Sequence, residues 1–302
     1  MGDLDRTVEW EVLDISKWQT ADVDFYAMKK SGIKGVIIRI NNADNAMTKD
    51  PLFEWFYKKA KEADLHVGAY WFTRATSLSY VEMEAKKCIE WVKNKQFDLP
   101  IYFDIEGQEQ FALGMTFCTN ITKRFCEILQ NAMLFVGVYC STFWYTNYVA
   151  KSVRDKFACW IAEWGSKCTY TGQYGMWQNN NKKRYPFICK GAVDVDHSIC
   201  YVDYPSAIKK RKRNGYGMNC LDCTEVWKYG HSDWGVYSLK MLLNVAYNKC
   251  ICDVKVTKSP IYDDTLKNAL NTLLTKWGYV ANGILGENFI KKLSDEIERS
   301  KK

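Results

Sequence analysis

The sequence predicts an α/β protein in which a barrel of parallel strands is followed by a smaller, mostly helical domain. Strand-like and helical segments alternate five times between residues 12 and 141, which is typical of βαβ units that form a parallel sheet or barrel. Three further strand-like segments then follow with only loops between them. A barrel that closes with hairpin strands in place of helices explains this change.

The individual elements are predicted from hydrophobic periodicity. The apolar run G-V-I-I-R-I at residues 35–40 is typical of a buried parallel strand, and Phe53, Phe56 and Ala60 share one helical stripe. The strands of the repeat are predicted at residues 12–16, 35–40, 66–72, 99–107 and 136–141. The helices are predicted near residues 25–30, 52–65, 80–92 and 116–132, and the closing strands at 157–164, 173–178 and 192–197.

The predicted strand L-P-I-Y-F-D-I-E-G at residues 99–107 carries a pair of acids. Apolar residues alternate with Tyr102, Asp104 and Glu106, so these three share one face of the strand. Two carboxyls at this spacing lie roughly 7 Å apart, and each raises the pKa of the other. Burial raises the pKa of one further, so that one acid stays protonated while the other is ionised. The alternative is a strand end whose acids simply reach solvent.

Other polar and aromatic residues also fall near the ends of predicted strands. Sites in parallel α/β barrels lie at the carboxyl ends of the strands. The residues near such ends are Asp14, Tyr70, Asp104, Glu106, Tyr139 and Trp164. This coincidence favours a functional cleft over a solvent-exposed strand end.

The excess positive charge is confined to the last third of the 302-residue chain. Residues 209–302 hold 17 Lys+Arg and 10 Asp+Glu, whereas residues 1–208 hold 25 of each, and five basic residues form the run K-K-R-K-R at 209–213. The distribution favours an anionic surface as partner, whether cell wall, nucleic acid or lipid headgroups. Residues 209–217 are linker-like in composition, which predicts domains at 1–208 and 218–302.

Neither a signal peptide nor a membrane span is predicted. The N-terminal stretch M-G-D-L-D-R-T-V-E-W lacks a basic start and an apolar core. No apolar run approaches the ~18 residues that a transmembrane helix needs. We therefore expect synthesis in a cytoplasm, no membrane insertion, and another exit route for any extracellular role. Without a signal, most of the 12 cysteines are expected to be reduced core residues.

Seven motifs between residues 10 and 208 carry a family resemblance. In order, they are D-I-S-K-W-Q, V-G-A-Y-W-F, L-P-I-Y-F-D-I-E, V-G-V-Y-C-S, W-I-A-E-W, M-W-Q and V-D-V-D. In this order and spacing they resemble the family 25 glycoside hydrolases, lysozymes (N-acetylmuramidases) that cut bacterial peptidoglycan. The resemblance implies a flattened (β/α)5(β)3 barrel, which matches the alternation of the predicted elements.

The resemblance also implies roles for four acids. Glu106 looks like the general acid that protonates the departing sugar oxygen, and Asp104 resembles the second carboxylate, which stabilises positive charge at the reacting carbon. Asp14 and Asp194 look like the acids that flank them. The family usually has asparagine where this chain has Asp196, so either Asp194 or Asp196 points into the cleft, and Asp194 is favoured. The sequence leaves open whether the reaction retains the configuration of the sugar through a carboxylate nucleophile or through the substrate's own N-acetyl group.

Aromatic and amide side chains complete the predicted cleft. Tyr70, Tyr139 and Trp164 would offer flat apolar faces to sugar rings, whose axial C–H bonds pack well on aromatic rings. Ordinary core packing is the alternative for each. The residues predicted to bind substrate are Tyr70, Tyr102, Tyr139, Trp164, Gln178 and Asp196.

The last third resembles, more faintly, a helical peptidoglycan-binding module. Helices are predicted at residues 234–246, 263–277 and 287–299. S-L-K-M-L-L-N is similar to the first helix of that module, and G-Y-V-A-N-G-I-L-G-E-N-F to its glycine turn and following helix. Asn282 stands where an aspartate is often found. The resemblance implies a wall-targeting role for residues 218–302.

Two sequence features would fit a zinc site and a nucleic-acid partner, but other observations argue against both. Cys220-x-x-Cys223 with Cys250-x-Cys252 is one residue short of the usual zinc spacing, so no metal or cofactor is expected. The basic run alone resembles a nucleic-acid signal, but an acidic cleft repels phosphate. No nucleic-acid partner is therefore expected.

Together these observations predict a cytoplasmically made peptidoglycan hydrolase, most like a bacteriophage endolysin, that acts on the bacterial wall after release at lysis. Its expected partners are peptidoglycan and anionic wall polymers. A bacterial autolysin is the second enzyme hypothesis. The alternative from another class is a catalytically inactive wall-binding lectin on the same barrel, and the retention of four acids in one cleft argues against it.

Overall fold

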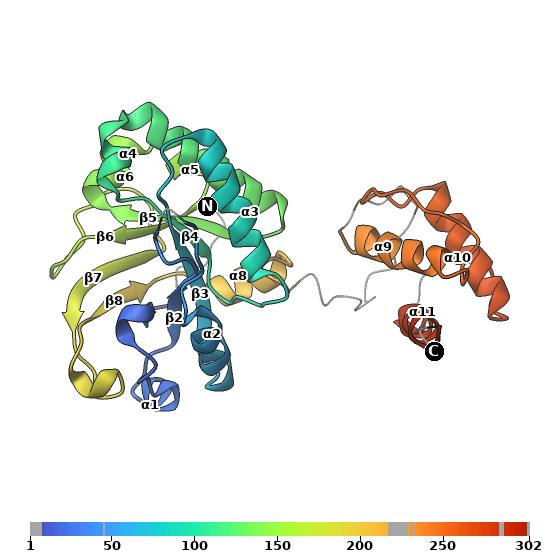
Figure 1. The fold of residues 1–302 in the computed structure, drawn as a ribbon, viewed down its shortest axis with the longest axis horizontal. Coiled ribbons are helices and arrows are strands. Elements are labelled where there is room, and N and C mark those ends of the chain that lie inside the picture. The colour runs from blue at the N-terminus through green and yellow to red at the C-terminus, as the bar shows by residue number, and fades with distance from the viewer. Residues whose placement is uncertain are drawn as a thin grey trace. The chain divides into compact units, whose positions relative to one another are not determined.

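A computed structural model describes residues 8–44, 46–216, 229–230, 232, 234–283 and 287–300. The chain divides into two compact units, Met1–Gly215 and Tyr216–Lys302 (Figure 1). Each unit has its own apolar core. No helix in the described part of the chain has the length and apolarity needed to cross a membrane.

The first unit is a closed barrel of eight strands in sequence order (Figure 1). Neighbouring strands from β1 to β7 run parallel, whereas β8 runs antiparallel to both β7 and β1. The strands are β1 (Trp10–Ile15), β2 (Gly35–Arg39), β3 (His66–Phe72), β4 (Ile101–Asp104), β5 (Val136–Ser141), β6 (Ala158–Ala162), β7 (Met176–Lys183) and β8 (Val195–Cys200). The predicted α/β barrel is confirmed. The expected closure by hairpin strands is confirmed for β7 and β8, which pair antiparallel, but not for β6 and β7, which run parallel.

Helices connect the strands and begin where side chains satisfy free backbone N–H groups. Asp24, Ser77 and Ser141 each accept a hydrogen bond from a backbone N–H in the first turn of α1, α3 and α6. The helices of this unit are α1 (Phe25–Lys30), α2 (Phe53–Glu62), α3 (Leu78–Val92), α4 (Gln108–Ala112), α5 (Gly114–Asn131), α6 (Thr142–Tyr148), α7 (Lys151–Arg154) and α8 (Tyr204–Lys210). Periodicity did not predict α4, α6 and α7, because they span too few residues to show it.

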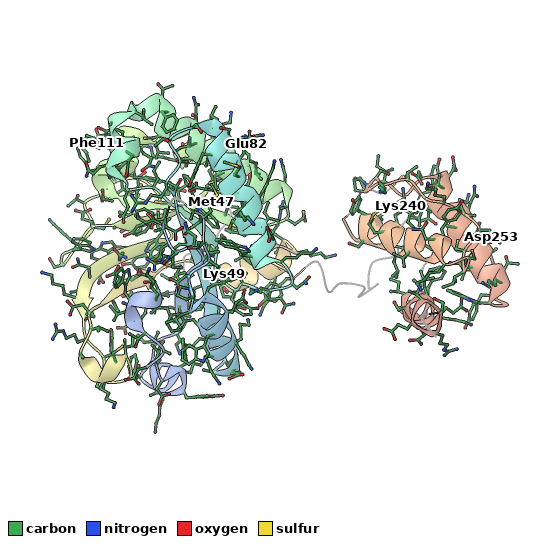
Figure 2. All side chains as sticks on the ribbon, in the orientation of Figure 1. Met47, Lys49, Glu82, Phe111, Lys240 and Asp253 are labelled. Carbon is green, nitrogen blue, oxygen red and sulfur yellow. The ribbon has the colours of Figure 1, made fainter. Side chains whose placement is uncertain are left out.

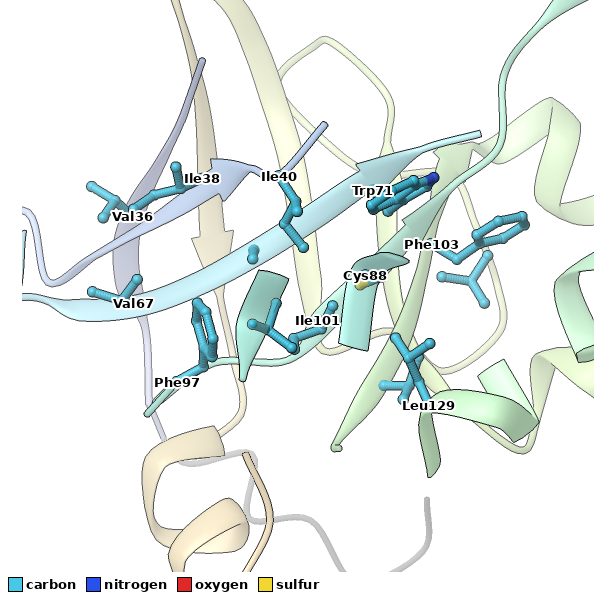
Figure 3. Close-up of a cluster of buried hydrophobic side chains, with 14 of the residues drawn as sticks. Val36, Ile38, Ile40, Val67, Trp71, Cys88, Phe97, Ile101, Phe103 and Leu129 are labelled. Carbon is cyan, nitrogen blue, oxygen red and sulfur yellow. The ribbon is translucent and has the colours of Figure 1, made fainter. Parts of the chain in front are cut away.

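The alternating side chains of each strand separate into two sets. One set packs outward against the helices and forms the main apolar core, where Trp71 and Phe103 of the barrel meet Cys88 of α3 and Leu129 of α5 (Figure 3). All four side chains are fully buried. This layer supplies most of the apolar burial that stabilises the unit.

The second set fills the barrel around Trp160 of β6. The ring centroid of Trp160 lies 4.4 Å from that of Tyr139, 5.0 Å from that of Tyr102 and 6.4 Å from that of Tyr70. A Cβ atom at Gly137 would lie 2.4 Å from the Tyr102 ring, so glycine makes room for that ring. The result is a dry aromatic floor inside the barrel.

The basic run at residues 209–213 belongs to the first unit, which corrects its prediction as part of a linker. Helix α8 extends to Lys210, and Arg213 donates 2.7 Å to a backbone carbonyl of α5. Asn214 is fully buried. Its side-chain oxygen accepts from the Phe135 backbone N–H at 2.7 Å, and its nitrogen donates to the Leu99 carbonyl at 3.0 Å. Residue 217, the last of the predicted linker, lies outside the described residues.

The second unit packs α9 (Trp234–Asn248), α10 (Asp264–Lys276) and α11 (Glu287–Arg299) around its own core, so its three predicted helices are confirmed. Lys240 of α9 (Figure 2) is fully buried. Its Nζ donates to Thr257 Oγ1 at 2.8 Å, Ser259 Oγ at 3.1 Å and Asp263 Oδ2 at 2.7 Å. The three acceptors match the three ammonium hydrogens, so a buried charge holds the connection between α9 and α10.

Replacing Asn214 by alanine should lower the free energy of unfolding of the first unit by about 2–4 kcal/mol. The change leaves a buried N–H and a buried carbonyl without partners, at about 1–3 kcal/mol each. Urea unfolding followed by tryptophan fluorescence measures the loss. Lys210→Ala, at an exposed position of the same segment, is the control and should change stability by less than about 0.5 kcal/mol. Equal effects of the two variants would show that the segment is not anchored.

Candidate active site

Three aspartates from different strands meet at one end of the barrel. Asp14 lies near the end of β1, and Asp104 is the last residue of β4. Because β8 runs antiparallel, its beginning lies at the same end, and Asp196 is the register partner of Asp14. Glu106 follows β4 by two residues, and its side chain is exposed. The barrel therefore gathers four carboxyls at the carboxyl ends of its parallel strands.

The side-chain amide of Gln178 on β7 forms hydrogen bonds to four residues at this end of the barrel. The side chain is buried, and its Oε1 accepts from the Tyr139 hydroxyl at 3.0 Å and from Trp164 Nε1 at 3.1 Å. Its Nε2 donates to Asp14 Oδ2 at 3.1 Å and to Asp196 Oδ2 at 3.2 Å. The reversed amide would set its NH2 group against the indole N–H and its oxygen against two carboxyls. Only one orientation of Gln178 satisfies all four neighbours.

Asp14 and Asp196 form a coupled pair beside this amide. Burial raises the pKa of Asp14 well above its usual value, and the charge of Asp196 raises it further, while the Gln178 hydrogen bond opposes the shift. Burial also raises the pKa of Asp196, against a lowering hydrogen bond from Asp14. Ionising both carboxyls at this separation is unfavourable, so the pair retains a proton above the pH at which an ordinary aspartate loses it.

Asp104 and Glu106 differ in their access to solvent. Asp104 is only 3 % exposed, and its Oδ1 has no hydrogen-bond partner among the described residues. Burial raises the pKa of Asp104 well above its usual value, the charges of Glu106 and Asp14 add to this, and Arg39 opposes it. The side chain of Glu106 reaches solvent, yet the protein around its carboxyl raises the pKa of Glu106, and the charge of Asp196 contributes. Glu106 is thus the accessible acid that resists ionisation, which suits a proton donor.

The structure reverses the preference between Asp194 and Asp196. Asp194 is exposed and precedes β8, which begins at Val195. Its Oδ1 accepts from Arg184 Nε at 2.7 Å, away from Gln178 and Asp14. Asp196 takes the place beside Asp14 that was expected for Asp194. The two aspartates do not share a strand face, because only Asp196 lies within the strand.

The predicted aromatic residues lie at different depths. Tyr70 is half-buried, Tyr139 lies beside Gln178, and Trp164 is 61 % exposed at the rim, with its indole N–H held by Gln178. Tyr102 is fully buried below them, against Trp160. The Tyr102 ring is enclosed inside the barrel and forms part of its floor, which does not support the prediction that Tyr102 binds substrate directly.

Sequence reasoning missed the cation of this site. Arg39, the last residue of β2, is buried, and its Nε and NH2 donate to Asp50 Oδ2 at 3.0 and 2.8 Å. The backbone N–H of Lys17 donates to the same oxygen at 3.0 Å. The Arg39 charge lowers the pKa values of Tyr70 and Asp104 against the upward effect of burial. A charged residue closing the otherwise apolar run at residues 35–40 was the available signal.

Among the residues that the structure describes, no three His, Cys, Asp or Glu side chains are arranged to hold a metal ion. Cys250 and Cys252 are free thiols. Cys220 and Cys223, the other half of the zinc spacing considered above, lie outside the described residues.

Comparison with known proteins identifies the family. The model for the family described as "Glycosyl hydrolases family 25" matches residues 13–187, more than half of the chain, and the protein belongs to this family. It is also similar to the autolytic lysozyme of Clostridium acetobutylicum, with 28 % identity over 187 residues, which are 61 % of this chain and 54 % of that protein. The chain thus spans about half the length of this curated relative.

Two solved structures share the fold of the first unit. The CTP1L endolysin matches with a TM-score of 0.57 and 21 % identity, over 67 % of this chain and 70 % of that chain. The modular autolysin LytC from Streptococcus pneumoniae, solved in complex with a synthetic peptidoglycan ligand, matches with a TM-score of 0.56 and 20 % identity. That match covers 64 % of this chain and 47 % of LytC. At these identities the likeness is one of fold.

Asp104→Asn should stabilise the protein more at pH 8 than at pH 4.5. A carboxyl whose pKa is higher in the folded than in the unfolded state costs stability as the pH rises from the unfolded pKa to the folded one. Thermal unfolding at both pH values measures the gain in stability. Asp194→Asn, at an exposed ion pair, should change stability by less than about 1 kcal/mol at either pH, and a pH-independent effect of Asp104→Asn would contradict the assignment.

Proposed function

We propose that this protein is a peptidoglycan hydrolase that cleaves the β-1,4 bond between N-acetylmuramic acid and N-acetylglucosamine. The observation that carries the proposal is the accessible acid Glu106, with its raised pKa, beside the buried carboxyl of Asp104 at the active end of a family 25 barrel. An oxocarbenium-like transition state needs a proton for the leaving oxygen and negative charge near the reacting carbon. Glu106 is placed to supply the proton, and Asp104 supplies the negative charge once it ionises, which the Arg39 charge favours against burial.

Each residue of the site then has a part in the reaction. Glu106 donates a proton to the departing sugar oxygen, since it is open to substrate and its pKa is raised by burial and by the charge of Asp196. Asp104 faces the reacting carbon from below, and Arg39 favours its ionised form. Asp14 and Asp196, held by Gln178, place further negative charge near the developing cation. No metal or cofactor takes part in this proposal.

The aromatic side chains bind the sugars. The Trp164 indole is exposed for stacking, and its N–H bond to Gln178 fixes the ring orientation. Tyr139 and Tyr70 line the cleft below it. Aromatic faces bind the axial C–H bonds of sugar rings, so a glycan strand lies over Trp164 with its scissile bond at Glu106.

The proposed biological role is bacteriolysis at the cell wall, as in a phage endolysin. The fold neighbours include an endolysin and an autolysin, and the autolysin LytC binds a synthetic peptidoglycan ligand. A bacterial autolysin is the alternative role for the same chemistry. Anionic wall polymers are further proposed partners of the basic residues at 209–213.

We also propose that the second unit binds the wall. Two hydrogen bonds connect the turn after α10 to that helix: the Gly283 N–H donates to Asn271 Oδ1 at 2.8 Å, and the Tyr279 N–H donates to the Leu274 carbonyl at 2.8 Å. The turn presents Tyr279 and Val280 to solvent, with 55 and 79 % of their surfaces exposed. An exposed aromatic and aliphatic pair supports binding to a glycan or peptide surface.

Digestion of purified walls by the full chain should create new reducing ends on N-acetylmuramic acid. Borohydride reduction followed by sugar analysis should then yield muramitol, whereas glucosaminitol alone would reject the proposed bond. Glu106→Gln should slow the release by ~10²–10⁴-fold, the usual contribution of one positioned acid. Because a carboxyl with a raised pKa costs stability when it ionises, the thermal unfolding midpoint of Glu106→Gln should not fall below that of the wild type. A variant retaining more than about a tenth of the rate would exclude Glu106 as the donor.

Residues 216–302 alone should bind insoluble walls without cutting them, and residues 1–215 should cut more slowly than the full chain. The second unit holds 12 Lys+Arg and 10 Asp+Glu, since the five basic residues at 209–213 lie in the first unit. Its binding should therefore survive ~0.5 M salt, which screens exposed charges within a few ångströms. A wall pull-down at low and high salt measures this, and no binding at low salt would refute the targeting role.

A further inference from the structure

A second cavity lies on the side of the barrel, away from the carboxyl cluster. Its volume is about 760 Å³, and its walls are α6, α7 and the loop that joins β6 to β7. This is the part of the barrel where no helix follows the strand, because residues 163–175 form a loop. The volume falls within the range of pockets that hold small ligands.

The lining of this cavity leaves one positive charge without a carboxylate partner. Lys151 forms an ion pair with Asp155, so these two charges cancel. Arg154 has no carboxylate within 4.0 Å among the described residues, and its Nε is buried without a hydrogen-bond partner there. The ring of Tyr170 and the exposed side chain of Thr171 also line the cavity. The Arg154 Cζ lies 5.9 Å from the centroid of the Tyr145 ring. A guanidinium that lines a cavity with hydroxyl groups and lacks a carboxylate partner suits a carboxylate ligand.

One backbone segment separates this cavity from the cleft. Trp164 directs its indole N–H to Gln178 in the cleft. The preceding residue, Glu163, directs its carboxylate the other way and accepts from the hydroxyls of Thr142 at 2.8 Å and Thr169 at 2.7 Å. Both threonines line the cavity. A substituent on a sugar that stacks on Trp164 therefore meets the threonine end of the cavity first, and Arg154, which precedes β6, lies toward the other end of that strand.

We propose that this cavity binds the carboxylate-bearing peptide attached to the glycan whose sugars occupy the cleft, with Arg154 as its anion-binding residue. The inference rests on the proposed function, since it takes the peptide-substituted glycan as the ligand. The peptide supplies free carboxylates for Arg154 and amide groups for the hydroxyl-lined walls. It also gives the enzyme a means to distinguish peptide-bearing from bare glycan.

Calorimetric titration of the full chain carrying Glu106→Gln, which leaves the ligand intact, tests this directly. The ligands are a tetrasaccharide of alternating N-acetylglucosamine and N-acetylmuramic acid with its peptides, and the same tetrasaccharide without them. We expect the peptide-bearing ligand to bind at least about fivefold more tightly. Adding Arg154→Gln or Thr171→Glu should remove this difference and leave the affinity for the bare tetrasaccharide unchanged.

Two matched variants control for charge and for folding. Lys156→Gln removes the same charge two residues away, at an exposed ion pair with Glu127 outside this cavity, and Thr171→Gln alters the same position without adding charge. Both should keep the fivefold preference. Equal affinity for the two ligands, or a preference that survives Arg154→Gln and Thr171→Glu, would overturn the proposal.

Two further outcomes distinguish the peptide site from a site for a wall polymer and from the proposed hydrolase activity. If Arg154-dependent binding is seen only with a phosphate-containing wall polymer, the ligand is that polymer and the peptide proposal is wrong. If the wild-type chain releases no reducing ends while the Arg154-dependent preference persists, the hydrolase proposal fails and the peptide site stands.

Discussion

One buried amide organises the mouth of the barrel. Gln178 binds a hydroxyl from β5, an indole from the loop after β6, and carboxyls from β1 and β8. These four partners come from parts of the chain as far apart as residues 14 and 196, and the amide can satisfy them in only one orientation. The position of the exposed Trp164 indole is thereby tied to the position of the acid pair Asp14 and Asp196.

The acids keep their raised pKa values because the barrel below them excludes water. Trp160 and the rings around it form an apolar floor, and ionised carboxyls above such a floor are poorly solvated. The fold tolerates this cost because the outer core of strands against helices is extensive. Activity and stability therefore pull in opposite directions at Asp104, as is usual for preorganised sites.

Burial alone does not mark a residue of the site. Burial raises the pKa of Glu84 on α3 to about 7, yet its carboxyl accepts from the Thr73 hydroxyl at 2.6 Å and the Arg74 N–H at 2.9 Å. It supports the segment after β3, where the Thr73 N–H donates to the Asp104 carbonyl at 2.9 Å. Glu84 lacks what distinguishes Glu106, which is exposure on the active end of the barrel.

Periodicity predicted the barrel because its strands alternate between a helix-covered face and an enclosed one, and this alternation is visible in the sequence. It also placed Asp14, Asp104 and Glu106 at one end. Periodicity could not predict how deep inside the barrel a side chain lies, nor at which residue a strand begins. Tyr102 shares its strand face with Asp104 but lies one layer deeper, where its ring is enclosed.

The choice between Asp194 and Asp196 failed for a similar reason. Two residues at this spacing share a face only if both lie in the strand, and β8 begins at Val195. The basic run at 209–213 has the composition of a linker, yet Asn214 directly after it is buried by contacts with backbone groups distant in sequence. Neither the first residue of β8 nor the burial of Asn214 can be predicted from the neighbouring residues in the sequence.

The central claim is that burial and the charge of Asp196, which Gln178 holds in place, raise the pKa of Glu106, the proposed proton donor. The most direct test is the pH dependence of kcat/KM for wall hydrolysis in Asp196→Asn and Asp194→Asn. The negative charge of Asp196 raises the pKa of Glu106, and a general acid loses activity as the pH rises through its pKa. Asp196→Asn should therefore move the alkaline limb of the profile to lower pH, and Asp194→Asn should leave that limb in place. An unmoved limb in Asp196→Asn, or the same shift in both variants, would contradict the account.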